Sequence, residues 1–347
     1  MPVQDSEGRP PSKVVFLTDG EADWYGDGYA IENARWSPLG VTAVASGCET
    51  EEEVLVAGRD ADAIVSISVR VPITGRVIRS LERCRCVVRA GVGYNNIDLA
   101  AATEQGIVVN NVPDYCTADV ADHTVAMILA LVRRLPFLDR FVRGGGWQYS
   151  VQFTGPVPRL ATLTLGLVGF GRIAHQVAHK MAPLVASVLA HDPHVDDAPY
   201  GVRMESLEVL LAQSDILSLH LPLLPTTRHL LGVEQLALLK PSAVLVNTSR
   251  GGLVDQDALA RALREKRLAA AALDVLEEEP LSFGNPLAAL DNVLFTPHFA
   301  GYSESAKSDL RESVAESVAA VLEGFWPPHV LNPEVRPRLS LEDHHEE

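Results

Sequence analysis

Residues 163–181 read LTLGLVGFGRIAHQVAHKM, and this stretch is the strongest indication of the fold. Its opening apolar run is typical of a buried strand, and its second half has the apolar spacing of a helix. Between them, Gly169 permits a tight turn, Gly171 lets the backbone approach a pyrophosphate at the helix N-terminus, and Ala174 allows close helix–strand packing. The stretch therefore predicts the strand–loop–helix unit of a dinucleotide-binding domain.

An acidic residue follows at the distance that this chemistry requires. Asp192 ends the next expected strand, a little over twenty residues after Gly169. A carboxylate there accepts hydrogen bonds from both ribose hydroxyls and repels a 2′-phosphate, so the sequence favours NAD over NADP. We interpret the nearby Arg172 as a neighbour of the pyrophosphate.

Short apolar strands alternate with helical stretches on both sides of this unit. Strands are expected at KVVFLT, VTAVA, AIVSIS, RCVVRA and IVVNNV, with helices at TGRVIRSL and LAAATEQG, up to about Pro113. Further strands and helices follow residue 163, including a helix over 305–322. This alternation predicts the α/β class, with two doubly wound parallel sheets and right-handed crossovers.

A long helix is expected over residues 117–134, TADVADHTVAMILALVRR. Thr117 or Asp119 can cap it, and two arginines oppose the negative end of its dipole. From Thr124 to Val132 it is apolar on nearly every side, which favours a homodimer through this helix over a central helix buried inside one large subunit.

Three segments far apart in the chain each end an apolar run with a charged or titratable group. These are Arg250 in NTSRGG, Glu279 in DVLEEEP and His298 in FTPH. The carboxyl ends of parallel strands form the edge where ligands bind. An arginine holds a carboxylate through two hydrogen bonds, a histidine passes a proton near neutral pH, and an adjacent glutamate keeps that histidine charged. The trio predicts a site that reduces a 2-keto acid.

Each member of the trio has a simpler interpretation. Arg250 could form a surface salt bridge and His298 could be a buried core histidine, but the presence of all three groups favours catalysis. Of the three consecutive glutamates, Glu279 precedes Pro280 and is biased toward extended backbone, whereas Glu277 and Glu278 are expected in an acidic surface turn.

Composition narrows the partners. The formal net charge of −16 argues against nucleic acid and anionic membranes, and no run of 18 apolar residues or N-terminal signal sequence exists, so we expect a soluble, cytoplasmic protein. Cys84 and Cys86, with one residue between them, are expected on the same face of a strand. We expect all four cysteines to be buried, reduced thiols and no metal site.

The stretch RAGVGYNNID, residues 89–98, is the expected substrate loop. Gly91 and Gly93 can offer backbone N–H groups to a carboxylate, and Tyr94 can shape the loop, with a purely structural turn as the alternative. Arg70 could face the same pocket. Ser68 stands where a second cation for a phosphorylated substrate could lie, which weakens a phosphoglycerate substrate without excluding it.

Six stretches together resemble the D-isomer-specific 2-hydroxyacid dehydrogenase family: GLVGFGRIA, HDP, SLHLPLLPTTRHLL, LLKPSAVLVNTSRGGLVD, ALDVLEEEP and TPHFAGYSE. The resemblance runs from about residue 64 to residue 332. It implies an NAD-binding domain, 114–299, inserted into a discontinuous substrate-binding domain, 1–113 and 300–335. The acidic segment 336–347 is expected to be a mobile tail.

The resemblance also implies roles. Arg250 would anchor the substrate carboxylate and polarise the keto oxygen, His298 would be the acid/base, and Glu279 its partner. The predicted cofactor-binding residues are Gly169, Gly171, Arg172, Ile173, Asp192, His220, Pro222, Thr226, Thr248, Ser249, Arg250, Asp274 and His298. The predicted substrate-binding residues are Arg70, Gly91, Val92, Gly93, Tyr94 and Arg250.

Two functions other than NAD-dependent reduction of a 2-keto acid to the D-2-hydroxy acid, or the reverse, remain open. VPDYCTADVADHTVAMILALVRR and PHFAGYSE resemble most closely the C-terminal-binding-protein branch of the family, which implies an NAD(H)-sensing dimeric corepressor as one alternative. D-3-phosphoglycerate dehydrogenase is the other. Gly301 stands where that branch carries an aromatic residue, so the substrate side chain is not determined by the sequence.

Overall fold

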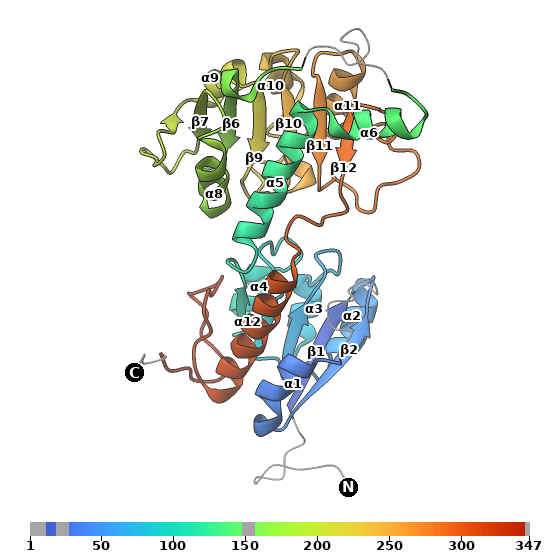
Figure 1. Cartoon of the computed structure of the whole chain (residues 1–347). Coiled ribbons are helices and arrows are strands. Elements are labelled where there is room, and N and C mark those ends of the chain that lie inside the picture. The colour runs from blue at the N-terminus through green and yellow to red at the C-terminus, as the bar shows by residue number, and fades with distance from the viewer. Residues whose placement is uncertain (1–11, 19–27, 148–156, 344–347) are drawn as a thin grey trace. The chain divides into compact units, whose positions relative to one another are not determined.

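The computed structural model describes residues 12–18, 28–147 and 157–343, and the chain divides into two compact units. Unit 1 comprises Met1–Tyr115 and Ser303–Glu347, and unit 2 comprises Cys116–Tyr302. Each unit has one parallel sheet with helices around it (Figure 1). The expected α/β fold with two parallel-sheet domains is therefore confirmed.

Unit 1 has a five-stranded sheet in the order β2-β1-β3-β4-β5. The strands are β1 (Ser12–Thr18), β2 (Val41–Gly47), β3 (Ala63–Ser66), β4 (Cys86–Arg89) and β5 (Val108–Asn111). The helices are α1 (Ala30–Trp36), η2 (Ser37–Leu39), α2 (Glu51–Gly58), α3 (Gly75–Ser80), α4 (Leu99–Glu104) and α12 (Glu304–Glu323). The sequence patterns identified the five strands but missed α1 and α2, which bury few apolar side chains.

Helix α12 returns to unit 1 from the far end of the sequence and lies along α1 (Figure 1). Its apolar residues, including Leu310 and Val314, pack on the same sheet face as Phe16. The Trp36 indole N–H donates to the Ala315 carbonyl at 2.8 Å. A fully buried pair, Glu32 with Arg311 at 2.6 Å, also joins the two helices.

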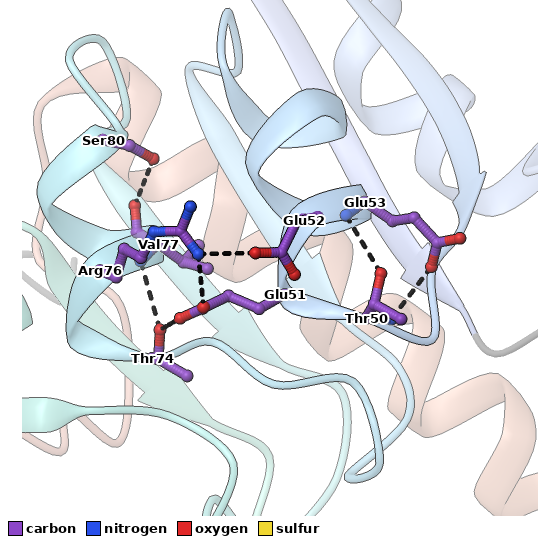
Figure 2. Close-up of polar contacts among 8 residues, drawn as sticks. All are labelled: Thr50, Glu51, Glu52, Glu53, Thr74, Arg76, Val77 and Ser80. Carbon is purple, nitrogen blue, oxygen red and sulfur yellow. Dashed lines mark hydrogen bonds and ion pairs between the residues drawn. The ribbon is translucent and has the colours of Figure 1, made fainter.

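A polar cluster joins α2 to α3 on the surface of unit 1 (Figure 2). Thr50 and Glu53 form a reciprocal capping box at the start of α2, which satisfies two backbone N–H groups. Glu51 accepts from the hydroxyl of Thr74, the N-cap of α3, and from Arg76 at 2.8 Å. The two helix N-termini are thereby fixed to each other.

Unit 2 has a seven-stranded sheet in the order β12-β11-β10-β9-β6-β7-β8. The strands are β6 (Thr164–Val168), β7 (Ser187–His191), β8 (Arg203–Met204), β9 (Ile216–Leu219), β10 (Val244–Asn247), β11 (Ala270–Leu273) and β12 (Val293–Phe295). The helices are α5 (Thr117–Val132), α6 (Leu135–Arg143), η3 (Leu160–Thr162), α8 (Arg172–Met181), α9 (Leu207–Gln213), α10 (Val233–Leu238), η4 (Gly251–Leu253) and α11 (Gln256–Arg264). The strand order reverses between β6 and β9, and ligands bind at such a point in open α/β sheets.

Two local expectations are wrong. Helix α5 begins after Cys116, which makes no side-chain capping bond, so neither Thr117 nor Asp119 is its cap, and the helix ends at Val132. Cys84 precedes β4 and packs with the core on one side of the sheet, whereas Cys86 lies in the strand and packs on the other side. The one-residue spacing failed because Cys84 is not in a strand. All four cysteines are buried, as expected.

The segment from residue 336 is attached to unit 1 over its described part. The Arg338 guanidinium donates to the carbonyls of Leu81, Glu82, Cys84 and Gln105. Backbone bonds also join Glu342 to Gly324 and Trp326. We expected this segment to be a mobile tail. In the structure, however, the Arg338 side chain and the backbone of Glu342 form hydrogen bonds with unit 1. Residues 344–347 lie outside the described part of the chain.

Candidate active site

The glycine loop lies at the point where the order of the unit 2 strands reverses. Gly169 follows β6 with φ +85°, and a Cβ there would lie 2.4 Å from the carbonyl oxygen of His220, which follows β9. A side chain at this position would thus meet both backbone strain and a rigid neighbour. Gly171 is the N-cap of α8 without a side-chain cap, and a Cβ there would enter open space.

Asp192 follows β7 beside this loop. Its Oδ2 accepts from the Phe170 N–H and its Oδ1 from the His194 N–H, both at 2.9 Å. A carboxylate has about four acceptor positions, so two remain for ribose hydroxyls. An open helix N-terminus with an acidic residue at the end of the next strand fits a dinucleotide, whose pyrophosphate meets the helix N–H groups.

His220 lies under the glycine loop with both ring nitrogens away from solvent. Its Nε2 is 2.9 Å from Ser218 Oγ, and its Nδ1 is buried with no hydrogen-bond partner in the structure. Burial lowers the pKa of His220 to about 3. The ring is therefore neutral at physiological pH. The backbone of His220 packs directly against Gly169 of the glycine loop.

This neutral histidine predicts a pH dependence of folding. Between about pH 6.5 and pH 3 the unfolded chain takes up a proton that the folded chain does not, so stability falls as the pH falls through this window. His220 should contribute at most about 1.4 kcal/mol per pH unit to the pH dependence of the free energy of unfolding. The substitution His220→Gln should remove this contribution. Urea unfolding of the unchanged protein and of His220→Gln at a series of pH values measures this pH dependence. His179→Gln, at an exposed histidine of α8, is the control; equal slopes in all three proteins would contradict the prediction.

The backbone of a neighbouring loop fixes the position of Arg250. Arg250 follows β10, and a Cβ on the next residue, Gly251, would lie 1.8 Å from the backbone carbon of Leu276. Only glycine allows the two loops to pass this closely, and Leu276 leads directly to Glu279. The Asn247 side chain also donates to the Arg250 carbonyl at 2.9 Å. Arg250 is half-buried, and its charge acts on Glu279.

Glu279 and His298 form the central pair of the site, with Glu279 Oε2 2.8 Å from His298 Nδ1. Burial raises the pKa of Glu279, but the hydrogen bond to His298 and the charges of His298 and Arg250 lower it, and the net pKa lies below the usual value. Because an ionised carboxylate only accepts hydrogen bonds, His298 Nδ1 carries a proton. Its Nε2 is then the nitrogen that can exchange a proton with a substrate.

The backbone around His298 is held by Asp274, which follows β11. The Asp274 carbonyl accepts from the His298 N–H at 2.8 Å, Oδ1 from the Phe299 N–H at 2.8 Å, and Oδ2 from the Ala300 N–H at 3.0 Å. Three successive N–H groups thus converge on one buried residue. They hold His298 at φ +55°, a conformation that few non-glycine residues adopt.

The two neighbouring glutamates differ from each other. Glu277 lies at the surface, as expected, but its Oε1 is 3.1 Å from His229 Nε2 and accepts from the Gln256 N–H, so it fixes the start of α11. Glu278 is exposed. The structure thus pairs Glu279, and neither of its neighbours, with His298.

The remaining predicted cofactor residues line the same edge of the unit 2 sheet. Thr248 Oγ1 is 2.8 Å from Thr124 Oγ1 of α5, and the Ser249 hydroxyl donates to the Leu219 carbonyl at 2.6 Å. Pro222 and Thr226 lie in an exposed loop after β9. Arg172 and Ile173 open α8.

In unit 1, a buried arginine organises the predicted substrate loop. Arg89 ends β4, and its guanidinium donates to the carbonyls of Ser66, Ile67, Ala90 and Gly93. Gly91 has φ +142° and packs against this guanidinium. The sequence did not indicate that the Arg89 donors are used by backbone carbonyls, because two of these carbonyls belong to the separate segment 66–67.

The other predicted substrate residues lie on or near this loop. The Val92 carbonyl accepts from the Asn111 side chain at 2.7 Å, and Tyr94 is exposed. Arg70 is exposed, and its N–H donates to the Ser68 hydroxyl at 3.1 Å.

Among the described residues, every helix is too short or too polar to span a lipid bilayer.

Comparison with known proteins follows the same division of the chain. Residues 125–300 match the family model described as D-isomer specific 2-hydroxyacid dehydrogenase, NAD binding domain. The chain is 40% identical to a glyoxylate reductase of Korarchaeum cryptofilum over 80% of this chain and 84% of that protein. It is also 40% identical to a D-3-phosphoglycerate dehydrogenase of Methanocaldococcus jannaschii, over 85% of this chain but only 56% of that longer protein.

The fold is also similar to that of a solved dehydrogenase structure. The D-lactate dehydrogenase of Aquifex aeolicus, complexed with NAD and lactic acid, superposes with a TM-score of 0.79 at 29% identity, covering 90% of this chain and 96% of that chain. The curated relatives reported above are named as enzymes. The expected position nearest the C-terminal-binding-protein branch is not supported by them.

Proposed function

Because the chain belongs to the D-isomer-specific 2-hydroxyacid dehydrogenase family, we propose that it reduces a small 2-keto acid to the D-2-hydroxy acid with NADH, or catalyses the reverse reaction. The observation that carries the proposal is the Glu279–His298 pair beside Arg250, in the same unit as the dinucleotide loop. Acid–base and anion-binding groups gathered at one sheet edge suit this reaction.

Each residue of the trio has a defined step. A nicotinamide dinucleotide held by the Gly169–Gly171 loop and Asp192 would supply the hydride that adds to C2 of the keto acid. His298 donates the proton on Nε2 to the keto oxygen, so the carbonyl becomes a hydroxyl and the histidine becomes neutral. Ionised Glu279 fixes the ring through Nδ1, and Arg250 binds the substrate carboxylate. In the reverse direction, neutral His298 takes the hydroxyl proton.

Glyoxylate and similarly small keto acids are the proposed substrates. Support comes from the relatives that are named glyoxylate reductases, such as that of Korarchaeum cryptofilum, to which this chain is 40% identical over 84% of that protein. A phosphorylated substrate would need clustered cations, and in the SISVR segment only Arg70 is basic, with Ser68 two residues before it.

The proposal is tested with a panel of 2-keto acids and NADH, followed by loss of NADH absorbance. Glyoxylate, pyruvate, hydroxypyruvate and phosphohydroxypyruvate are compared at equal concentration. We expect turnover of the smallest acids and little of the phosphorylated one. Preference for phosphohydroxypyruvate would support the phosphoglycerate alternative. NADH binding with no turnover of any acid would contradict the reductase and support the sensing alternative.

The cofactor preference gives a separate prediction. A 2′-phosphate beside the Asp192 carboxylate meets like-charge repulsion of several kcal/mol, so we expect kcat/KM with NADPH to be on the order of 100-fold lower than with NADH. Asp192→Asn keeps an acceptor for the Phe170 N–H but removes the charge, and it should narrow this difference. Equal use of NADH and NADPH by the unchanged protein would contradict the role of Asp192.

We also propose a homodimer through α5 and α6. Helix α6 has no buried residue and exposes Leu135 and Val142, and the Leu129 and Leu131 side chains of α5 are only partly buried. Such an apolar surface is typical of a subunit interface. The paired substitution Leu135→Glu and Val142→Glu should shift the protein to monomers in sedimentation velocity; an unchanged dimer would place the interface elsewhere.

A further inference from the structure

Helix α5 contacts the loop of His298 through a residue to which the proposed reaction gives no role. His123 Nε2 lies 3.1 Å from the Thr296 hydroxyl, two residues before His298, and 3.8 Å from Asp274 Oδ1. Its ring also meets the Phe299 ring edge-on, with 6.5 Å between centroids and 61° between planes. The helix packs against β10 and β11, so this contact comes from a rigid element.

The direction of these hydrogen bonds follows from the chemistry of the groups. The Thr296 hydroxyl donates its single proton to Asp274 Oδ1. It can then only accept from His123, so His123 Nε2 must carry a proton. A directed chain results, from His123 through Thr296 to Asp274. Asp274 in turn receives the N–H groups of the three residues 298–300.

The next residue of α5 makes a parallel contact with the other loop of the site. Thr124 Oγ1 lies 2.8 Å from Thr248 Oγ1, two residues before Arg250, and both side chains are buried. Adjacent residues of one helix therefore touch the loops that carry His298 and Arg250, two of the three groups of the proposed reaction. An apolar residue at position 123 could fill the same space. Only a hydrogen-bond donor there, however, gives the oxygen of the Thr296 hydroxyl a partner to accept from.

We propose that His123 is a positioning residue for His298, acting through Thr296 and Asp274. The proposal rests on the proposed function, since positioning matters for the reaction that His298 performs. The His123 donor fixes the Thr296 hydroxyl, and the hydroxyl fixes the Asp274 carboxylate. The carboxylate holds the N–H groups of Phe299 and Ala300, directly after the left-handed residue His298, and so aims the His298 ring. Small errors in such geometry are costly in catalysis.

The test uses substitutions of similar size that differ in hydrogen bonding. His123→Gln keeps an N–H donor and His123→Leu removes it; Thr296→Ser keeps the hydroxyl and Thr296→Val removes it. His179→Leu, at an exposed histidine of α8, is the control. Each purified full-length protein is measured for kcat and KM with the best keto acid, for the Kd of NADH, and for Tm.

A second measurement is independent of turnover. The proton on His298 Nδ1, bonded to Glu279, is followed by NMR of histidine-labelled protein and identified as the signal missing in His298→Gln. We expect this signal to shift or broaden in His123→Leu and Thr296→Val, and to stay in place in His123→Gln, Thr296→Ser and His179→Leu. A change in folding stability alone would not move it.

The expected kinetic result is a fall in kcat of about 10- to 100-fold for His123→Leu and Thr296→Val, with the KM of the keto acid and the Kd of NADH unchanged. The conservative variants should recover most of kcat. An unmoved NMR signal in His123→Leu, or equal losses in His123→Gln and His123→Leu, would overturn the inference. If the signal moves as expected while the unchanged protein reduces no keto acid, the proposed function fails and the positioning role stands.

Discussion

His298→Gln is expected to lower kcat for keto-acid reduction by about 10²- to 10⁴-fold, the usual contribution of a positioned acid–base group. Glutamine keeps a polar side chain of similar length, but it cannot supply a proton at the keto oxygen. NADH binding should persist, because the dinucleotide loop and Asp192 are unchanged. The measurement is steady-state NADH oxidation, with the Kd of NADH taken from fluorescence titration.

The chain contains a matched control for this substitution. His229 forms the same kind of pair with Glu277, with the same side-chain exposure of 40% for the histidine and 26% for the glutamate. Both histidines also have left-handed backbone, with φ +51° and +55°. His229→Gln should leave kcat close to that of the unchanged protein. If the two substitutions reduced kcat equally, the loss would be structural and His298 would not be the acid/base.

Arg250→Leu is expected to lower kcat/KM by on the order of 30- to 5,000-fold, which corresponds to about 2–5 kcal/mol for losing one partner of a close charge pair. The loss has two causes: the substrate carboxylate loses its cation, and Glu279 loses a nearby positive charge. Arg250→Lys restores the charge without the planar fork, so its kcat/KM should lie between those of Arg250→Leu and the unchanged protein.

Saturation kinetics with the keto acid as the varied substrate measure this effect. Arg264→Lys, at an exposed arginine in the last turn of α11, is the control and should leave kcat/KM unchanged. Arg250→Leu with an unchanged KM for the keto acid would show that another group holds the carboxylate.

The elements whose sequence signals lie within a few neighbouring residues were predicted correctly. The five unit 1 strands and the glycine loop follow from apolar runs and from turn residues that act within a few positions, so their order in the sequence sufficed. Helix α1 was missed because its buried residues Glu32 and Trp36 pair with the distant Arg311 and Ala315, and α2 was missed because it buries only Val54 and Gly58.

The residues that organise the loop of unit 1 and the candidate site of unit 2 could not be found in the same way. The Arg89 donors are used by carbonyls from two separate segments, residues 66–67 and 90–93. The Asp274 carboxylate is about 25 residues from the N–H groups that it accepts, and His123 is 173 residues from Thr296. Neither spacing has a periodicity that a sequence pattern can reveal.

The sequence by itself determined the fold class and indicated the chemical groups of the proposed site. Apolar runs ending in Arg250, Glu279 and His298 place these groups at strand ends, because a parallel strand buried on both faces must be apolar until it leaves the sheet. The tertiary structure alone decided which glutamate pairs with His298, which nitrogen of that ring is left for a substrate, and what holds its backbone. Those properties depend on distances between separate loops, and only the packing of α5, β10, β11 and β12 sets them.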